Sequence, residues 1–152
     1  MSSFDIAVIS VRLDHLLKEA RIDNVYQINP ETLLLKIRGR DQPTLDLLIE
    51  AGKRIHLTWY SFPRPQRPTS FCMALRKHLR NGKIHAVRQY EFERIVEITI
   101  SGRTGEYRLI SEFFGDGNII LVGQENKIIQ ALLYRRMRDR DIAPKERFVY
   151  PP

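Results

Sequence analysis

Cysteine is almost absent from this sequence, and so are the usual signs of a secreted, metal-binding or membrane protein. A single thiol, Cys72, can form neither an intramolecular disulfide nor a Cys-based zinc site, and the four His residues show no metal-ligand spacing. No apolar run approaches the roughly 18 residues that a membrane-spanning helix needs. The first residues, Met-Ser-Ser-Phe-Asp, have neither the basic nor the apolar region of a signal peptide. We therefore expect a cytoplasmic protein with no metal, no cofactor and no membrane contact.

Acidic residues are outnumbered, and the excess of positive charge suggests a polyanionic partner. The chain of 152 residues has 25 Lys and Arg against 18 Asp and Glu, so its net charge is +7 and its isoelectric point is about 9.8. An isoelectric point above roughly 9 is typical of nucleic-acid-binding domains, and the planar guanidinium of Arg suits phosphates and stacked bases. The alternative is a basic surface without a ligand.

Two stretches have the periodicity of amphipathic helices. Apolar side chains recur at steps of three and four in residues 4–20 and again in residues 70–81, which predicts one helix in each range. Ser or Thr side chains at residues 2–3 and 69–70 can cap these helices, and Asp5 lies in the first turn of the first one. The expected apolar stripes are Ile6, Ile9, Leu13, Leu16 and Ala20 in the first helix, and Phe71, Leu75 and Leu79 in the second.

Most of the remaining sequence has the pattern of short antiparallel strands separated by turns that contain Gly, Asn or Pro. Three prolines exclude residues 62–68 from a helix interior or a central strand, so we expect an extended surface connector there. The expected strands are residues 21–28, 32–38, 45–49, 53–59, 83–89, 94–100, 107–113, 118–122 and 127–133.

A weak internal repeat suggests how these elements are arranged. Ile22 and Val25 follow the first helix, and Ile84 and Val87 follow the second helix 62 positions later. Chance is the alternative, because β-branched residues are common in strands. If the repeat is real, two helix-plus-sheet halves pack together and each sheet buries one face against the other.

The expected fold class is therefore α+β, a mainly antiparallel β-sandwich with two flanking helices. We expect a single domain over residues 1–152, with halves at about residues 1–62 and 69–134 and a basic tail at residues 134–152. The double proline at the end of the sequence has the composition of a linker. It suggests that the chain is a fragment of a longer protein.

No group of residues has the spacing of a catalytic centre. Asp5, Glu50, Glu93 and Glu112 are acidic candidates by count only, and surface or ion-paired carboxylates are the more ordinary interpretation of them. Cys72 lies among apolar neighbours on the second helix, which favours a packed thiol over a nucleophile.

Three basic clusters are candidates for contact with nucleic acid, and a solvated charged face is the alternative for each. The basic residues of the connector cluster are interleaved with aromatic residues, a composition that suits binding to unpaired bases and phosphates. The clusters are Arg64 and Arg67 with Trp59, Tyr60 and Phe62 in the connector, Arg76, Lys77 and Arg80 on the second helix, and Arg135, Arg136, Arg138 and Arg140 in the tail.

Several runs together resemble the N-terminal domain of the NFACT family, which includes the NEMF, FbpA, Caliban and RqcH proteins. The most specific run is residues 68–79, Pro-Thr-Ser-Phe-Cys-Met-Ala-Leu-Arg-Lys-His-Leu. The others are residues 1–5, 21–27, 54–58, 93–96, 112–115, 118–121 and 136–140. They occur in the order of the family and cover nearly the whole chain, and their wording resembles that of archaeal members.

The resemblance implies a fold similar to the N-terminal domain of formamidopyrimidine-DNA glycosylases. It also implies a protein that binds large ribosomal subunits with a stalled peptidyl-tRNA, and that holds tRNA, with alanyl-tRNA as a candidate, while the nascent chain is extended without a template. The glycosylases attack DNA with an N-terminal proline amine followed by glutamate, whereas positions 2 and 3 here are Ser2 and Ser3. A tRNA-positioning module, and no enzyme, is therefore expected, because a shared fold does not carry an activity with it.

The resemblance also implies which residues contact tRNA. The family's acidic residue near the start corresponds to Asp5, its Asp-Arg pair to Glu93 and Arg94, and its Glu-apolar pair to Glu112 and Phe113. We add four basic residues from the clusters to this expected RNA-binding set. These residues are Arg76, Lys77, Arg136 and Arg138.

Two positions depart from the family pattern. Glu93 stands where the family has Asp, so its carboxylate is one methylene further from the backbone, and Asp116 stands where a basic residue often follows the family's glycine. Three alternative functions remain. They are a nucleic-acid-binding domain without a ribosome role, a DNA glycosylase and a fibronectin-binding adhesin.

Overall fold

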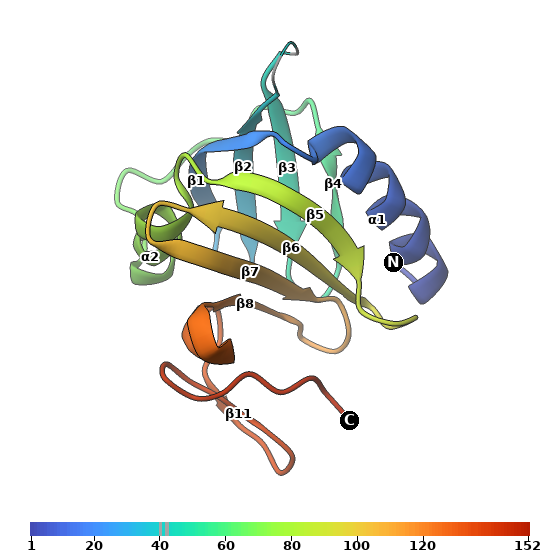
Figure 1. Ribbon diagram of the computed structural model, residues 1–152, viewed down its shortest axis with the longest axis vertical. Helices are drawn as coiled ribbons and strands as arrows, with labels where there is room; N and C mark the ends of the chain where they lie inside the picture. The colour runs from blue at the N-terminus through green and yellow to red at the C-terminus, as the bar shows by residue number, and fades with distance from the viewer. Residues whose placement is uncertain (40, 42) are drawn as a thin grey trace.

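The computed structural model describes residues 1–39, 41 and 43–152, and it consists of two helices and a large antiparallel sheet (Figure 1). The helices are α1 (Ser3–Leu17) and α2 (Ser70–Leu79). The strands of the large sheet are β1 (Arg21–Asn29), β2 (Thr32–Arg38), β3 (Leu45–Glu50), β4 (Arg54–Thr58), β5 (Lys83–Gln89), β6 (Ile95–Gly102), β7 (Gly105–Glu112), β8 (Asn118–Val122) and β9 (Ile128–Ala131). A 3-10 turn, η1 (Gln124–Asn126), precedes β9, and a small hairpin of β10 (Arg135–Arg136) and β11 (Asp141–Ile142) follows it.

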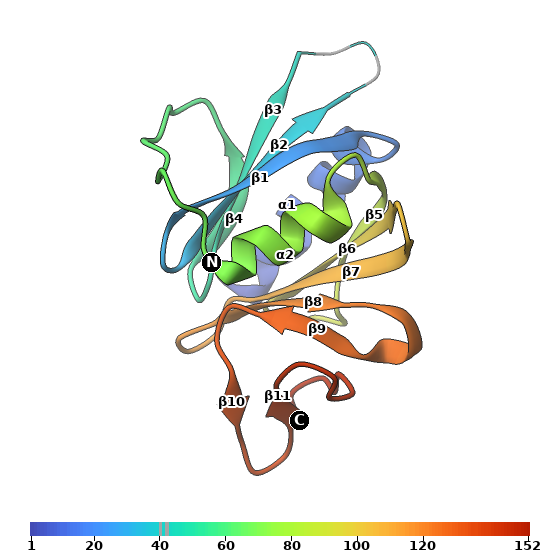
Figure 2. The ribbon, with the colours of Figure 1, turned by 90° about the vertical axis from the view of Figure 1, so that its left-hand side faces the viewer.

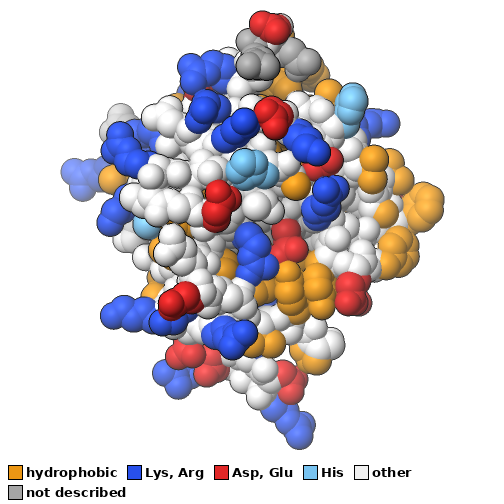
Figure 3. All heavy atoms as spheres, in the orientation of Figure 1, with side chains coloured by type: hydrophobic (Ala, Val, Ile, Leu, Met, Phe, Trp, Pro, Cys, Tyr) orange, Lys and Arg blue, Asp and Glu red, His pale blue; other side chains and the backbone are white. Residues whose placement is uncertain are grey.

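Both helices begin at the side chains that the sequence suggested. Ser2 caps α1 in a reciprocal box with Asp5, and the Thr69 hydroxyl caps α2 by accepting from the Cys72 amide. The predicted apolar stripe of α1 was partly wrong, because Leu16 is exposed and the buried stripe also contains Ser10 and Leu17. Its opposite face leaves apolar side chains in solvent, and these gather over α1 on the face shown in Figure 3.

All nine strands of the large sheet are antiparallel, in the order β4-β3-β2-β1-β5-β6-β7-β8-β9. The α+β class, the antiparallel sheet and the two flanking helices are therefore confirmed. The two layers of the expected sandwich are parts of one continuous sheet. It folds at the junction of β1 and β5, where a single residue pair, Arg21 opposite Lys83, links the halves. In Figure 2 the layer of β1–β4 faces the layer of β5–β9, and Figures 1 and 2 together place the two helices on opposite sides.

Four hydrogen bonds at this junction obey the offset of 62 residues. The Glu19 amide donates to the Ile84 carbonyl, and the amide 62 positions later, Asn81, donates to the Ile22 carbonyl. Glu19 and Asn81 both adopt a positive φ, at 74° and 66°. The second matched pair of bonds is Ile84 N to Ala20 O and Ile22 N to Gly82 O. This agreement supports the proposed repeat.

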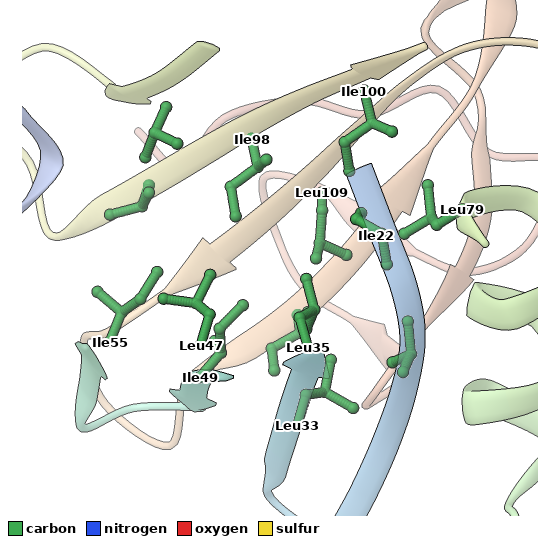
Figure 4. Packing of buried hydrophobic residues seen from close by; sticks show 14 of the residues in the cluster. Ile22, Leu33, Leu35, Leu47, Ile49, Ile55, Leu79, Ile98, Ile100 and Leu109 are labelled. Atoms are coloured by element: carbon green, nitrogen blue, oxygen red, sulfur yellow. The ribbon is translucent and has the colours of Figure 1, made fainter. Parts of the chain in front are cut away.

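The main core lies between the two layers. Leu33, Leu35 and Leu47 point from β2 and β3 toward Ile98 and Leu109 of β6 and β7 (Figure 4), and all five side chains are fully buried. A second apolar cluster lies on the outer face of β6–β9, which explains why every residue of β8 is buried. Burial of apolar area on both faces stabilises this half of the sheet by about 25 cal/mol for each Å² removed from water.

The basic tail at residues 134–152 packs against the rest of the domain through its apolar side chains. Ile142 and Phe148 pack into the second cluster, and the ring of Tyr150 stacks on Tyr90 at 3.6 Å between centroids. The tail as far as Tyr150 is therefore part of the folded domain. Its many charged residues gave no sign of this packing in the sequence. In the part of the chain that the structure describes, neither helix has the length and apolarity to cross a bilayer.

Two turns from different halves meet through glycines, which generates a prediction about stability. A Cβ atom on Gly117 would lie 1.9 Å from the amide nitrogen of Gly52, and the φ of Gly117 is +76°. We expect Gly117→Ala to lower the free energy of unfolding by about 3–5 kcal/mol, as overpacking adds to an unfavourable φ.

Gly115→Ala is the matched control, because Gly115 also has a positive φ but a Cβ there meets nothing within 4 Å. It should cost only about 1 kcal/mol. Urea unfolding measures both variants, and equal losses would show that the contact between the two turns does not constrain the fold.

Candidate nucleic-acid interface

One end of the sandwich collects segments that are far apart in the sequence. It consists of the N-terminus of α1 and the turns at residues 51–53, 90–94 and 113–117, and we name it the turn end. The Met1 amino group donates to the Lys53 carbonyl at 3.2 Å, and the Gly52 amide donates to the Glu112 carbonyl at 3.1 Å. The Phe113 amide donates to the Arg94 carbonyl at 2.8 Å. These bonds fix the four segments against one another.

A single side chain ties the turn at residues 90–94 to α1. The Gln89 amide group donates to the Ser3 carbonyl at 2.9 Å and to the Glu93 carbonyl at 2.8 Å. The structure therefore brings Asp5, the pair Glu93–Arg94 and the pair Glu112–Phe113 to one end of the molecule. Sequence reasoning named these residues separately and did not place them together.

Glu93 and Arg94 are the exposed pair at the turn end. Within the described residues, neither side chain forms a hydrogen bond or an ion pair, and both are in solvent. A local ion pair between them, the structural alternative to a binding role, is not formed. Their backbone is held by the Gln89 and Phe113 bonds, so both side chains project from a fixed turn. An ordered turn with a free carboxylate and a free guanidinium can accept and donate charge-assisted hydrogen bonds.

Asp5 has a structural task at the same end. One of its carboxylate oxygens, Oδ2, accepts from the amide and from the hydroxyl of Ser2, both at 2.9 Å. The amide bond and then the hydroxyl bond lower the pKa of Asp5, because both favour the charged form. The carboxylate therefore stays ionised and completes the capping box of α1. Its other oxygen, Oδ1, remains available to a ligand.

Glu112 and Phe113 are buried beneath the surface of the turn end. The Glu112 carboxylate accepts two hydrogen bonds at 2.7 Å from the guanidinium of Arg140, and the exposed fractions of the two side chains are 3% and 5%. Arg140 also donates to the Val149 carbonyl at 3.0 Å. Both carboxylate oxygens are therefore occupied, and the pair fastens the tail to β7. Arg140 is no surface charge, which corrects its place in the tail cluster.

The remaining predicted residues lie on α2 and on the tail hairpin, and the hairpin adjoins the turn at residues 113–117 through the ion pair of Arg135 with Asp116. Arg76 and Lys77 are on α2, whereas Arg136 and Arg138 are on the β10–β11 hairpin (Figure 2). Arg76 is half-buried and donates to the Val25 carbonyl at 2.7 Å, so it also holds α2 to β1. The other three are exposed.

Asp116 is less repulsive than its sequence position suggested. Its carboxylate pairs with Arg135 at 3.5 Å, so the negative charge at this turn is locally compensated. The described residues contain no cluster of three His, Cys, Asp or Glu side chains that could hold a metal ion.

A strong charge signal in the sequence was missed. Residues 51–90 contain nine of the 25 Lys and Arg residues and none of the 18 Asp and Glu residues, so the rest of the chain has 16 cations and 18 anions. This acid-free segment contains β4, the proline connector, α2 and β5. The positive net charge of the protein is therefore confined to one segment, which ends beside Glu93 and Arg94.

Comparison with known proteins identifies the family of this chain. Residues 2–152 match the family model described as NFACT N-terminal and middle domains. This chain belongs to the NFACT family. The archaeal Rqc2 homologue aRqcH of Methanocaldococcus jannaschii is 37% identical over 157 residues, which cover 100% of this chain and 23% of that protein.

Two further NFACT relatives extend the comparison. The ribosome quality control complex subunit NEMF of Homo sapiens is 32% identical over 150 residues, or 99% of this chain and 14% of NEMF. The crystal structure of the N-terminal domain of fibronectin-binding protein PavA from Streptococcus pneumoniae superposes with a TM-score of 0.92 at 32% identity, and the match covers 100% of this chain and 64% of that one. The NFACT chain thus spans less than a quarter of the length of aRqcH and of NEMF.

The buried ion pair generates a prediction. Arg140→Met leaves the Glu112 carboxylate buried without a partner, so we expect the free energy of unfolding to fall by about 3–5 kcal/mol. The double variant Glu112→Met, Arg140→Met should recover much of this loss, because no unpaired charge remains. Chemical denaturation of the two variants measures the effect.

Arg54→Met is the control, since Arg54 forms a 2.9 Å pair with Glu50 but is 55% exposed. It should change the free energy of unfolding by about 0–1 kcal/mol. A double variant that is less stable than Arg140→Met would contradict the role given to the buried pair.

Proposed function

We propose that this NFACT chain is the tRNA- and large-ribosomal-subunit-binding module of a ribosome quality control factor. Such a factor supports template-independent extension of stalled nascent chains. The observation that carries the proposal is the exposed, unpartnered pair Glu93–Arg94, held on an ordered turn at the end of an acid-free segment. The relatives named as ribosome quality control subunits give the biological setting.

Arg94 would bind the RNA backbone or a base edge. Its guanidinium can donate two parallel hydrogen bonds to a phosphate, or to the acceptors of a guanine. Glu93 accepts from a base amine or orients Arg94. Glu replaces the family's Asp at this position, but the carboxylate is free to rotate because the structure gives it no internal partner among the described residues.

The buried residues of the turn end act on RNA indirectly. The Glu112–Arg140 pair and the Phe113 amide fix the strand end that supports Arg94. Under this proposal Glu112 and Phe113 are positioning residues, while Asp5 keeps α1 at the same end. Arg76, Lys77, Arg136 and Arg138 add long-range attraction for phosphates, which steers a polyanion toward the turn end.

The chain acts as a binding module and not as an enzyme. The peptide bond is made by the ribosome, at whose large subunit the protein holds the tRNA, with alanyl-tRNA as the candidate, in the cytoplasm. Ser2 has no secondary amine, and its hydroxyl caps α1, so the glycosylase mechanism has no nucleophile at this position.

The pair at the turn end gives the central functional prediction. Arg94→Ala should weaken tRNA binding by about 1–3 kcal/mol and leave the melting temperature nearly unchanged. Binding is measured by titration at a fixed salt concentration, since phosphate contacts weaken steeply as salt rises. The measurement uses the full-length protein.

Arg103→Ala is the control, because Arg103 is also exposed and lies in the β6–β7 turn. It should change affinity much less than Arg94→Ala. The residue assignment fails if the folded double variant Glu93→Ala, Arg94→Ala binds tRNA and large subunits as tightly as the unmodified protein.

The absence of the glycosylase nucleophile gives a second prediction. We expect no cleavage of duplex DNA with an oxidised base above a no-protein control, over the time in which a glycosylase completes the reaction. Gel electrophoresis of a labelled duplex measures this. Cleavage that disappears in Ser2→Ala or Asp5→Ala would overturn the non-enzyme assignment.

A further inference from the structure

We propose that the proline connector, residues 62–68, together with Trp59 and Tyr60 just before it, is a second RNA-binding site that takes unpaired nucleotides. Trp59 and Tyr60 would stack on bases, and Arg64 and Arg67 would contact the phosphates. This site goes beyond the proposed tRNA contact at Glu93 and Arg94, and it stands on separate observations. Its ligand would be single-stranded RNA. The turn end gives no role to the aromatic and basic residues of this segment.

The first observation is the exposure of two neighbouring aromatic rings. Trp59 is 86% exposed and Tyr60 is 67% exposed, directly after the end of β4. The Tyr60 amide donates to the Thr58 hydroxyl at 3.1 Å, and the Tyr60 ring contacts Phe62 at 4.7 Å between centroids. The backbone is thus ordered while the rings remain in water. Large planar faces held in solvent are suited to stacking on unpaired bases.

The second observation is that the connector is attached to β1 at two points. The guanidinium of Arg64 lies 4.0 Å from the centre of the Tyr26 ring on β1. The connector ends where Thr69 hydrogen-bonds to Gln27 of β1 and caps α2. Pro63, Pro65 and Pro68 restrict the backbone between these points. In Figure 2 the connector stands away from the sheet between β4 and α2. Such a preordered loop loses little conformational entropy when a ligand binds.

The third observation, charge, favours RNA over a protein partner. The connector lies within the acid-free segment of residues 51–90, which has nine cations. Arg67 is exposed and lines a cleft of about 510 Å³ with Pro65 and Tyr134. A partner must therefore present both negative charge and flat apolar faces. Unpaired nucleotides present both, whereas a duplex hides its base faces in the stack.

The proposed site supplies its own reporter, because Trp59 is the only Trp in the chain. Its fluorescence should be quenched in a saturable manner when a single-stranded oligoribonucleotide of about ten residues is added, the scale of single-strand binding sites. A blunt-ended RNA duplex without unpaired bases and inorganic polyphosphate should each leave the fluorescence nearly unchanged. Equal quenching by polyphosphate, or no quenching by the single strand, would overturn the proposal.

Four variants separate this site from the tRNA contact, and a dye-labelled single strand measures the binding of those that lack Trp59. Trp59→Ala should weaken binding of the single strand by about tenfold, the effect of losing one stacked base, whereas Trp59→Phe should restore most of the affinity. Phe92→Ala is the matched control, since Phe92 is also exposed but lies in the turn at residues 90–94. Arg94→Ala should leave the Trp59 quenching intact. If Arg94→Ala leaves tRNA binding unaffected while Trp59 still responds, the tRNA contact fails and the connector site stands.

Discussion

The hydrogen bonds between the end of each helix and the first strand of the other half hold this domain together. Because the Glu19 amide bonds to Ile84 and the Asn81 amide bonds to Ile22, each helix crosses to the opposite half. α1 packs against β5, and α2 packs against β1. A sheet joined by only one residue pair at β1–β5 would otherwise be free to open. With the helices exchanged, opening the sheet would expose both helix faces and the core between the layers.

The candidate RNA-binding surfaces follow from this exchange. The first residues of α1 lie beside the turn at residues 90–94 because α1 crosses to β5, and the Gln89 side chain completes the contact. The tail is then fastened to the same end through Arg140 and Glu112. Hydrogen bonds and the buried ion pair thus position the segments of the turn end relative to one another, and the apolar core between the layers stabilises the fold beneath them. α2 and the connector pack against β1 of the first half, and the acid-free segment then continues through β5 to the turn that holds Glu93 and Arg94.

The bounds of the two helices and of the nine strands of the large sheet could be predicted from the sequence to within three residues. β2, β5 and β8 have the predicted bounds, because each is a short run rich in β-branched and other apolar residues that turn residues flank. Leu16 was assigned to the wrong face of α1, since Leu17 competes for the same stripe and only tertiary packing decides between them. The continuous sheet could not be predicted from a pattern of strands, because only one residue pair, Arg21 opposite Lys83, belongs to the strand ladder between the halves.

Burial of charge was the least predictable feature. Nothing in the sequence distinguishes Arg140 from Arg136 and Arg138. Arg140 is nevertheless buried, because it forms the ion pair with the buried carboxylate of Glu112. The same applies to the tail, whose Ile142 and Phe148 are isolated apolar residues in a charged stretch. In contrast, the acid-free segment of residues 51–90 was visible in the sequence. It is found by counting acids and bases separately along the chain.

The central claim is that RNA lies along the acid-free segment and reaches the turn end. Ultraviolet crosslinking of bound tRNA, followed by mass spectrometry of the crosslinked peptides, tests this most directly. The account predicts crosslinks within residues 51–90 and at residues 91–94, with weaker ones at the β10–β11 hairpin. Crosslinks confined to residues 96–133, with none in residues 51–94, would contradict it.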